Sequence, residues 1–245
     1  MEDMSPDFAA TDLTNHFLIA MPGLNDDLFG QSVVFLCEHS PRGALGLVIN
    51  KPSDITLNDL FDKVELPLRR ADLQGAPVFR GGPLQTERGF VLHDALGQAS
   101  ALGDDRTPPA VAAALREAST LVSESLLETP ADDGAADPAA PTVPAAAGSV
   151  YAATLTIPGG LEMTTSRDVL EAMAAGAGPR RVLVTLGYAS WGEGQLESEI
   201  GENNWLTVAA DPALIFDTPV AQRYERAMAL LGVSPWMLAP GSGHA

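Results

Sequence analysis

The feature that most constrains the fold is a pair of segments, residues 15–52 and 164–206, in which short apolar runs alternate with turn-forming residues. The apolar runs have the length of β-strands, and they end at Pro, Gly, Asn or Ser. Residues 32–38 and 44–50 flank a turn, which is typical of an antiparallel hairpin. The run 181–186 is almost wholly apolar, as expected for a strand that is covered on both faces.

Helical patterns interrupt these strands at irregular intervals. Residues 57–64 place their apolar side chains on one face, and Thr56 and Asp59 have the spacing of a capping box. Further helices are predicted at residues 165–173, 194–200 and 219–231. Strands and helices that alternate without βαβ repeats favour an α+β fold with a mixed sheet over a doubly wound fold.

One domain is predicted over residues 15–238, with flexible tails at 1–14 and 239–245. Residues 96–148 interrupt this domain as an insertion. In this insertion a helix is expected at about 110–128, and the Ala- and Pro-rich stretch 129–148 is expected to be a flexible linker.

The charge balance bears on possible partners. The chain has 14 Lys and Arg against 32 Asp and Glu, so its net charge is −18, which opposes binding to nucleic-acid backbones and to anionic membranes. One cysteine, no signal-peptide pattern and no membrane-length apolar run favour the cytoplasm.

Several motifs then point to a family. The stretches NHFLIAMP, GALGLVINKP, LGYASWGEGQLESEI and NNWL resemble the YqgE/AlgH family of bacterial proteins. The resemblance covers about residues 15–95 and 150–238, whereas the segment between them departs from the family pattern. It implies a single cytosolic α+β domain with a large, mixed, curled sheet packed by a few helices. It implies no particular reaction, although some members are named as transcriptional regulators linked to alginate control.

Candidate ligand-binding residues are the polar, glycine and aromatic residues at expected strand ends and turns. They are His39, Asn50, Lys51, Gly81, Gly82, Thr165, Ser166, Arg167, Gly187, Tyr188, Ser190 and Trp191. Residues 187–192, which hold the last four, are expected to form a loop. Each group also has a purely structural interpretation: Asn50 as a turn former, the 81–83 glycines as a sharp turn, Thr165 as a helix cap, and the aromatics as anchors of the loop. Glu197, Glu199 and Glu202 are interpreted as a solvated helix face.

No catalytic residue, metal site or cofactor is predicted. Cys37 and His39 are expected on one face of a strand, but a cysteine in an apolar run is better explained as a buried hydrophobe than as a nucleophile. His39, His93 and Cys37 lack metal-binding spacing, and Ser190 lies outside a G-x-S-x-G motif.

Three functions remain open at this point. The leading hypothesis is a noncatalytic regulator that binds an unknown small ligand or protein partner. The alternative is an enzyme whose site gathers His39, Lys51, Arg167, Tyr188 and Ser190. Direct DNA binding ranks last. The first two hypotheses expect positions 39, 51, 167 and 188–191 to line a common cavity.

Overall fold

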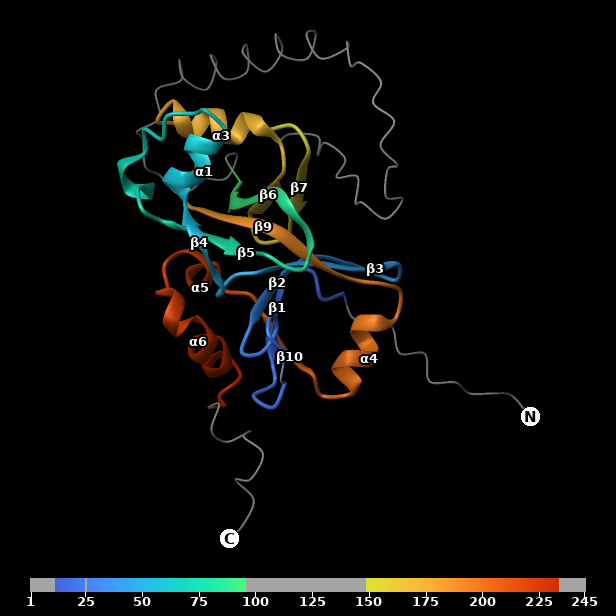
Figure 1. The fold of residues 1–245 in the computed structure, drawn as a ribbon. Coiled ribbons are helices and arrows are strands. Elements are labelled where there is room, and N and C mark those ends of the chain that lie inside the picture. Colours follow the sequence, from blue (N-terminus) through green and yellow to red (C-terminus); the bar gives the residue numbers. More distant parts are fainter. Residues whose placement is uncertain (1–11, 25, 96–148, 234–245) are drawn as a thin grey trace, which may run out of the picture.

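The computed structural model describes residues 12–24, 26–95 and 149–233 (Figure 1). Its strands are β1 (His16–Ala20), β2 (Val33–Ser40), β3 (Gly43–Val48), β4 (Pro52–Thr56), β5 (Pro77–Arg80), β6 (Leu84–Asp94), β7 (Thr154–Ile157), β8 (Leu161–Thr164), β9 (Val182–Trp191) and β10 (Trp205–Ala209). Its α-helices are α1 (Leu57–Lys63), α3 (Arg167–Ala174), α4 (Gln195–Gly201), α5 (Pro212–Phe216) and α6 (Arg223–Leu230). The predicted helix 110–128, the linker 129–148 and the tail 239–245 lie outside the described residues, as does most of the tail 1–14.

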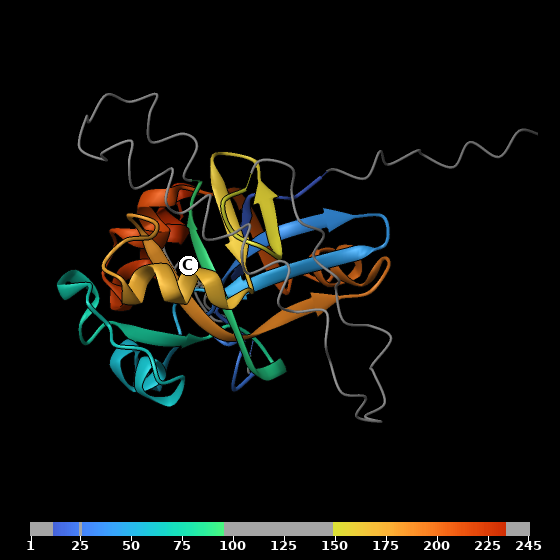
Figure 2. The same cartoon turned by 90° about the horizontal axis from the view of Figure 1, so that it is seen from above.

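All these strands belong to one curled sheet (Figures 1 and 2). The strand order is β10-β1-β2-β3-β9-β6-β8-β7, and β5 joins β4 to β9. The β5–β9 pair is parallel, whereas every other pair in the described chain is antiparallel. The fold is therefore a single α+β domain with a mixed sheet, as the sequence predicted.

Strand β9 joins the two halves of the sheet. It pairs with β3, with β6 and, in parallel, with β5. Most of its side chains are buried, which confirms the expected coverage of both faces. Because β1 also pairs with β10, the two segments that the sequence singled out interleave in one sheet.

The predicted hairpin is present as β2 and β3, but it contains a β-bulge. The register shifts between Leu36 and Glu38, so that Glu38 lies opposite Leu45 and His39 lies opposite Ala44. A bulge reverses the alternation of side chains beyond it. Cys37 therefore packs in the core on one face, and His39 lies on the other face, contrary to the expectation that they share a face.

The helices follow the predictions in part. Helix α1 begins at a complete capping box of Thr56 and Asp59, as expected. The N-cap of α3 is Ser166 and not Thr165. The predicted helix 219–231 is a short 3-10 turn, Val220–Gln222, followed by α6, and the sequence analysis missed α5.

The helices divide between the two faces and the two ends of the sheet. Alternate residues of β1 and β2 pack against α5 and α6 on one face, and the residues between them pack against α4 on the other. Helices α1 and α3 share a further apolar cluster with β6 and β9. Figures 1 and 2 both place α4 apart from α1, α3 and α6. None of the described helices is long and apolar enough to cross a membrane.

Candidate functional site

One cavity lies beside α4, and we call it the aromatic hollow. Its volume is about 500 Å³. The residues that line it are Leu24, Asp26, Phe29, Pro83, Leu84, Ser190, Trp191, Gln195, Glu199, Glu202, Asn204 and Trp205. They come from the chain after β1, the start of β6, the end of β9, helix α4 and the start of β10.

Three aromatic rings pack together in the hollow, and one carboxylate holds two of them. The rings of Phe29, Trp191 and Trp205 lie with their centroids 5.6 to 6.4 Å apart, two of the three pairs being edge-on. The indole N–H groups of Trp191 and Trp205 both donate to Glu199 Oε2, at 2.9 and 2.8 Å. Gln195 Nε2 donates to Glu199 Oε1 at 3.0 Å. Both buried indoles thus have the polar partner that a buried tryptophan requires.

The charges around the aromatic hollow are all negative. Asp26, Glu199 and Glu202 line it, and no Lys, Arg or His does. Their hydrogen-bond donors are neutral: backbone N–H groups for Asp26, and Ser198 and Asn204 for Glu202. Among the ion pairs of the described chain, none involves these three carboxylates.

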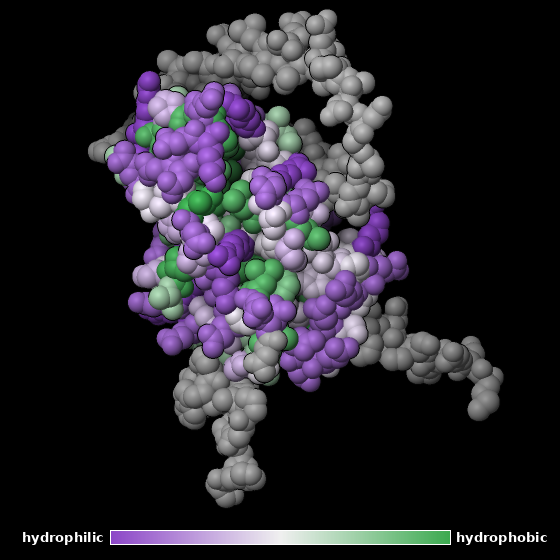
Figure 3. All heavy atoms as spheres, in the orientation of Figure 1, coloured by the Kyte–Doolittle hydropathy of each residue, from purple (hydrophilic) through white to green (hydrophobic). Residues whose placement is uncertain are grey.

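The second cavity, of about 260 Å³, lies between α1, α3 and the sheet, and we call it the aliphatic hollow. Its lining residues are Leu60, Val64, Glu87, Gly89, Val91, Thr164, Thr165, Ser166, Arg167, Leu170, Val184 and Leu186. Figure 3 shows hydrophobic surface in this region, bordered by hydrophilic side chains.

The arginines at the aliphatic hollow are already paired within the protein. Arg167 Nε donates to Glu171 Oε1 at 3.0 Å, and another N–H of Arg167 donates to the Val64 carbonyl at 3.2 Å. Arg88, beside the hollow, donates to the Thr165 hydroxyl at 3.2 Å. An incoming anion would have to compete with these contacts.

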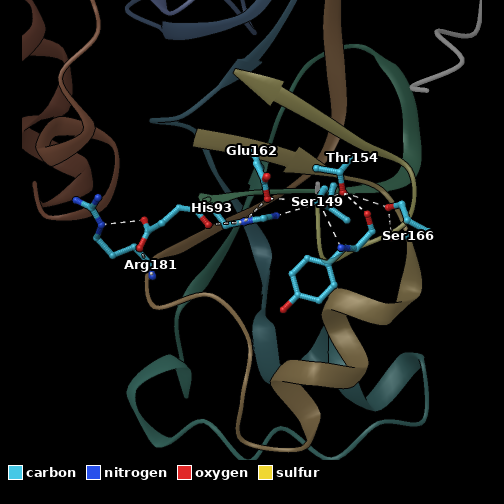
Figure 4. A network of polar contacts seen from close by, with 10 residues as sticks. His93, Ser149, Thr154, Glu162, Ser166 and Arg181 are labelled. Atoms are coloured by element: carbon cyan, nitrogen blue, oxygen red, sulfur yellow. Dashed lines mark hydrogen bonds and ion pairs between the residues drawn. The ribbon is translucent and has the colours of Figure 1, made fainter. Parts of the chain in front are cut away.

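A buried polar network lies behind the aliphatic hollow (Figure 4). The Thr164 hydroxyl is 2.9 Å from Nε2 of the fully buried His93 and 2.7 Å from the Thr154 hydroxyl. His93 Nδ1 is 2.9 Å from the Asp94 carbonyl, which can only accept, so Nδ1 carries a proton. Burial lowers the pKa of His93 and raises the pKa of Glu162, whose Oε2 is 4.0 Å from Nδ1.

The predicted site residues do not meet in one place. Thr165, Ser166 and Arg167 line the aliphatic hollow, and Ser190 and Trp191 line the aromatic hollow. The others line neither cavity: His39, Asn50, Lys51, Gly81, Gly82, Gly187 and Tyr188. Neither of these two cavities gathers positions 39, 51, 167 and 188–191, which were expected to line a common one.

His39 is fixed by two contacts. Its Nδ1 accepts from the backbone N–H of Leu13 at 3.1 Å, so Nε2 carries the proton and donates to Glu197 Oε1 at 3.0 Å. Cys37 is 1% exposed, and burial raises the pKa of its thiol far above the usual range. These two residues do not form a Cys–His pair.

Asn50 and Lys51 hold the chain segment that precedes β2. The Asn50 side chain accepts from Val33 N and donates to the Gln31 carbonyl, both at 2.8 Å. Lys51 Nζ donates to the Gly30 carbonyl at 2.6 Å, which anchors its side chain. Both residues therefore help to position neighbouring Phe29 in the aromatic hollow.

The glycines at 81, 82 and 187 allow close approach of the backbone. A Cβ at Gly82 would lie 2.1 Å from the carbonyl carbon of Tyr188, and neither Gly81 nor Gly82 has a positive φ. The predicted loop at 187–192 is mostly the end of β9, because residues 189–191 pair with β3. The buried Tyr188 ring packs against Phe90, at 5.3 Å between centroids.

Sequence reasoning missed Phe29, Leu84, Glu199 and Trp205. Glu199 was interpreted as part of a solvated face, yet it is half-buried and joins two indoles. A signal was present: tryptophans flank the acidic helix on both sides, and buried indole N–H groups need an acceptor.

The family resemblance is confirmed by comparison with known proteins. The profile of the AlgH-like family (DUF179) matches residues 17–129 and 137–236. UPF0301 proteins of Paracidovorax citrulli and Albidiferax ferrireducens are 60% and 59% identical over 242 residues, which is 99% of this chain and 100% of each relative. The matches thus extend into the segment 96–148, which the sequence analysis had set apart from the family pattern.

Solved structures show the same fold. The solution structure of the AlgH protein from Pseudomonas aeruginosa has 38% sequence identity and a TM-score of 0.59, with 100% of both chains covered. Protein DIP2367 from Corynebacterium diphtheriae has 16% identity and a TM-score of 0.54 over 88% of this chain and 85% of its own, and this likeness concerns the fold alone. By its sequence and its structural relatives, the chain belongs to the AlgH-like family.

Proposed function

We propose that this protein is a noncatalytic regulator and that the aromatic hollow is its ligand-binding site. The observation that carries the proposal is a cavity of about 500 Å³ in which Glu199 holds the indoles of Trp191 and Trp205 in place. Small-molecule sites commonly occupy about 300–1,000 Å³ and combine apolar walls with a few fixed polar groups. Rings that are already fixed lose little freedom when a ligand binds.

The dispersal of the possible catalytic groups favours binding over catalysis. Arg167 and Ser190 line different cavities, and His39 lines neither. A nucleophile and its base must lie within hydrogen-bonding reach of each other. The enzyme alternative required these groups to converge, so their separation supports the noncatalytic proposal.

The charge pattern supports a ligand other than nucleic acid. The aromatic hollow is lined by carboxylates and the whole chain carries −18, so phosphate backbones would be repelled. A regulator of this kind would act through a small ligand or a protein partner.

A thermal-shift and calorimetry screen of metabolites, together with co-purification from cells, tests this proposal. Ser190 is exposed and lines the hollow, so Ser190→Phe should fill the cavity without disturbing the core. Thr156→Phe is the matched control, because Thr156 is exposed on β7 and does not line the hollow. We expect a bound compound or partner to raise the Tm of the wild type and of Thr156→Phe, but not that of Ser190→Phe. No ligand or partner at physiological concentration, or binding unaffected by Ser190→Phe, would contradict the proposal.

A further inference from the structure

We infer that the aromatic hollow binds a small organic cation, such as an alkylammonium compound. This inference rests on the proposed function and adds the chemical class of the ligand. It depends on three properties of the hollow: negative charge that no cation of the described chain neutralises, apolar surface beside that charge, and the lack of a metal-binding group among the described residues.

The negative charge comes first. Asp26, Glu199 and Glu202 receive hydrogen bonds from neutral donors alone among the described residues. Such donors orient a carboxylate without cancelling its charge. The net charge of −18 adds a long-range field of the same sign, which attracts cations to the surface.

The apolar surface of the hollow indicates that the ligand has an organic part. Leu84 is 42% exposed, which is unusual for a leucine in this structure, and Phe29 is half-buried. An aromatic ring beside carboxylates favours an ammonium group, because the negative face of the ring attracts the cation. An alkyl stem next to that group would cover Leu84.

A metal ion fits the hollow less well. No group of three or more His, Cys, Asp or Glu side chains among the described residues is close enough to hold a metal ion. A larger organic cation can meet the carboxylates one at a time, and a cavity of about 500 Å³ has room for it.

The aliphatic hollow provides the internal contrast. Arg167 lines it, and its guanidinium pairs with Glu171. A cation entering there would meet the like charge of Arg167 and a single lining carboxylate, Glu87, in place of the three at the aromatic hollow. Selective binding of cations is therefore expected at the aromatic hollow.

Tryptophan fluorescence can test the inference directly. The chain has three tryptophans, and Trp236 lies outside the described residues, so Trp236→Phe leaves Trp191 and Trp205 as the reporters. This variant is titrated with choline and with 3,3-dimethylbutan-1-ol, its neutral isostere, and separately with spermidine and N-acetylputrescine. We expect a saturable change with the cations, and binding of the neutral isostere about tenfold weaker or more.

Two further variants locate the site. Glu202→Gln, on the exposed end of α4, should weaken cation binding about threefold to tenfold, and Leu84→Ala should weaken it about threefold. Glu225→Gln is the control, because Glu225 is exposed on α6 and does not line the hollow. Its affinity for the cations should equal that of the parent.

The outcomes separate the inference from the proposal on which it rests. Equal binding of choline and its neutral isostere, unchanged affinity in Glu202→Gln, or no binding of any cation in the panel would overturn the inference. If neutral compounds or anions bind and Ser190→Phe abolishes that binding, the proposed function stands without the cation. If nothing binds, both are overturned.

Discussion

The aromatic hollow and the aliphatic hollow differ in the charges that line them. At the aliphatic hollow, Arg167 is paired with Glu171, and Glu87 is the one carboxylate among the lining residues. At the aromatic hollow, the carboxylates have neutral donors alone within the described chain. One lining carboxylate beside a paired arginine should attract a cation less than three carboxylates that no cation of the described chain neutralises.

The hollows also differ in what holds their walls. The walls of the aromatic hollow are tied together by hydrogen bonds to Glu199, between β9, α4 and β10. The aliphatic hollow is instead bounded by aliphatic side chains that pack between α1, α3 and the sheet, and the hydrogen-bond network of the buried His93 lies behind them. Packing can adjust to a substitution more readily than a directional hydrogen-bond arrangement can.

The largest expected effect is the loss of an aromatic wall. Trp205 is 4% exposed, and Trp205→Ala should lower the free energy of unfolding by about 3–5 kcal/mol, because it removes packing and leaves a cavity. Leu60→Ala, at the half-buried wall of the aliphatic hollow, should cost about 1 kcal/mol. Urea unfolding measures both values. Equal losses would show that the two walls are equally adaptable.

The second effect concerns the carboxylate that joins the indoles. Glu199→Ala leaves the N–H groups of Trp191 and Trp205 without their acceptor, and we expect a loss of about 2–3 kcal/mol in the free energy of unfolding. Glu171→Ala removes an exposed ion pair with Arg167 and should change stability by about 0.5 kcal/mol or less. A loss for Glu199→Ala as small as that for Glu171→Ala would mean that water replaces the carboxylate easily.

The third effect compares one glycine near each hollow. A Cβ at Gly82 would collide with the backbone of Tyr188, next to the Pro83 and Leu84 edge of the aromatic hollow, so Gly82→Ala should cost about 2 kcal/mol or more. An added Cβ at Gly89, in the aliphatic hollow, meets no atom within 4 Å. Gly89→Ala should therefore be nearly neutral in thermal unfolding. The comparison fails if both variants unfold at the same temperature.

The helices and strands could be predicted from the sequence better than the contacts between them. The hairpin and the capping box of α1 follow from local patterns, since turn residues and side-chain periodicity act over a few residues. The family motifs also predicted the curled, mixed sheet. The β-bulge after Leu36 has no comparable signal, and it separated Cys37 from His39.

The candidate site was predicted in part for the same reason. Ser190 and Trp191 were expected at a ligand site because of their residue types and position, and they line the aromatic hollow. The role of Glu199 was missed because it depends on two tryptophans outside α4, Trp191 at the end of β9 and Trp205 at the start of β10. To predict which residues the sheet brings into contact, the register of its strands must be known, and a single sequence does not give that register.

The smallest expected effect is a dependence of stability on pH, which should arise from the buried His93 behind the aliphatic hollow. Burial lowers the pKa of His93 below its ordinary value, so between the folded and unfolded pKa values the unfolded chain binds more protons than the folded one. Stability should thus fall as the pH drops below about 6.5, by at most about 1.4 kcal/mol per pH unit for one proton. Protonation also places a hydrogen on Nε2, where the Thr164 hydroxyl now lies at 2.9 Å, and Thr164 lines the hollow. Urea unfolding of the wild type and of His93→Gln at about pH 7.5 and pH 5.5 measures how the free energy of unfolding changes with pH. Glu162, whose raised pKa has the opposite effect on stability, titrates in both proteins, so its contribution cancels to first order when the two are compared. Equal slopes in the two proteins would show that the His93 network does not couple this hollow to pH.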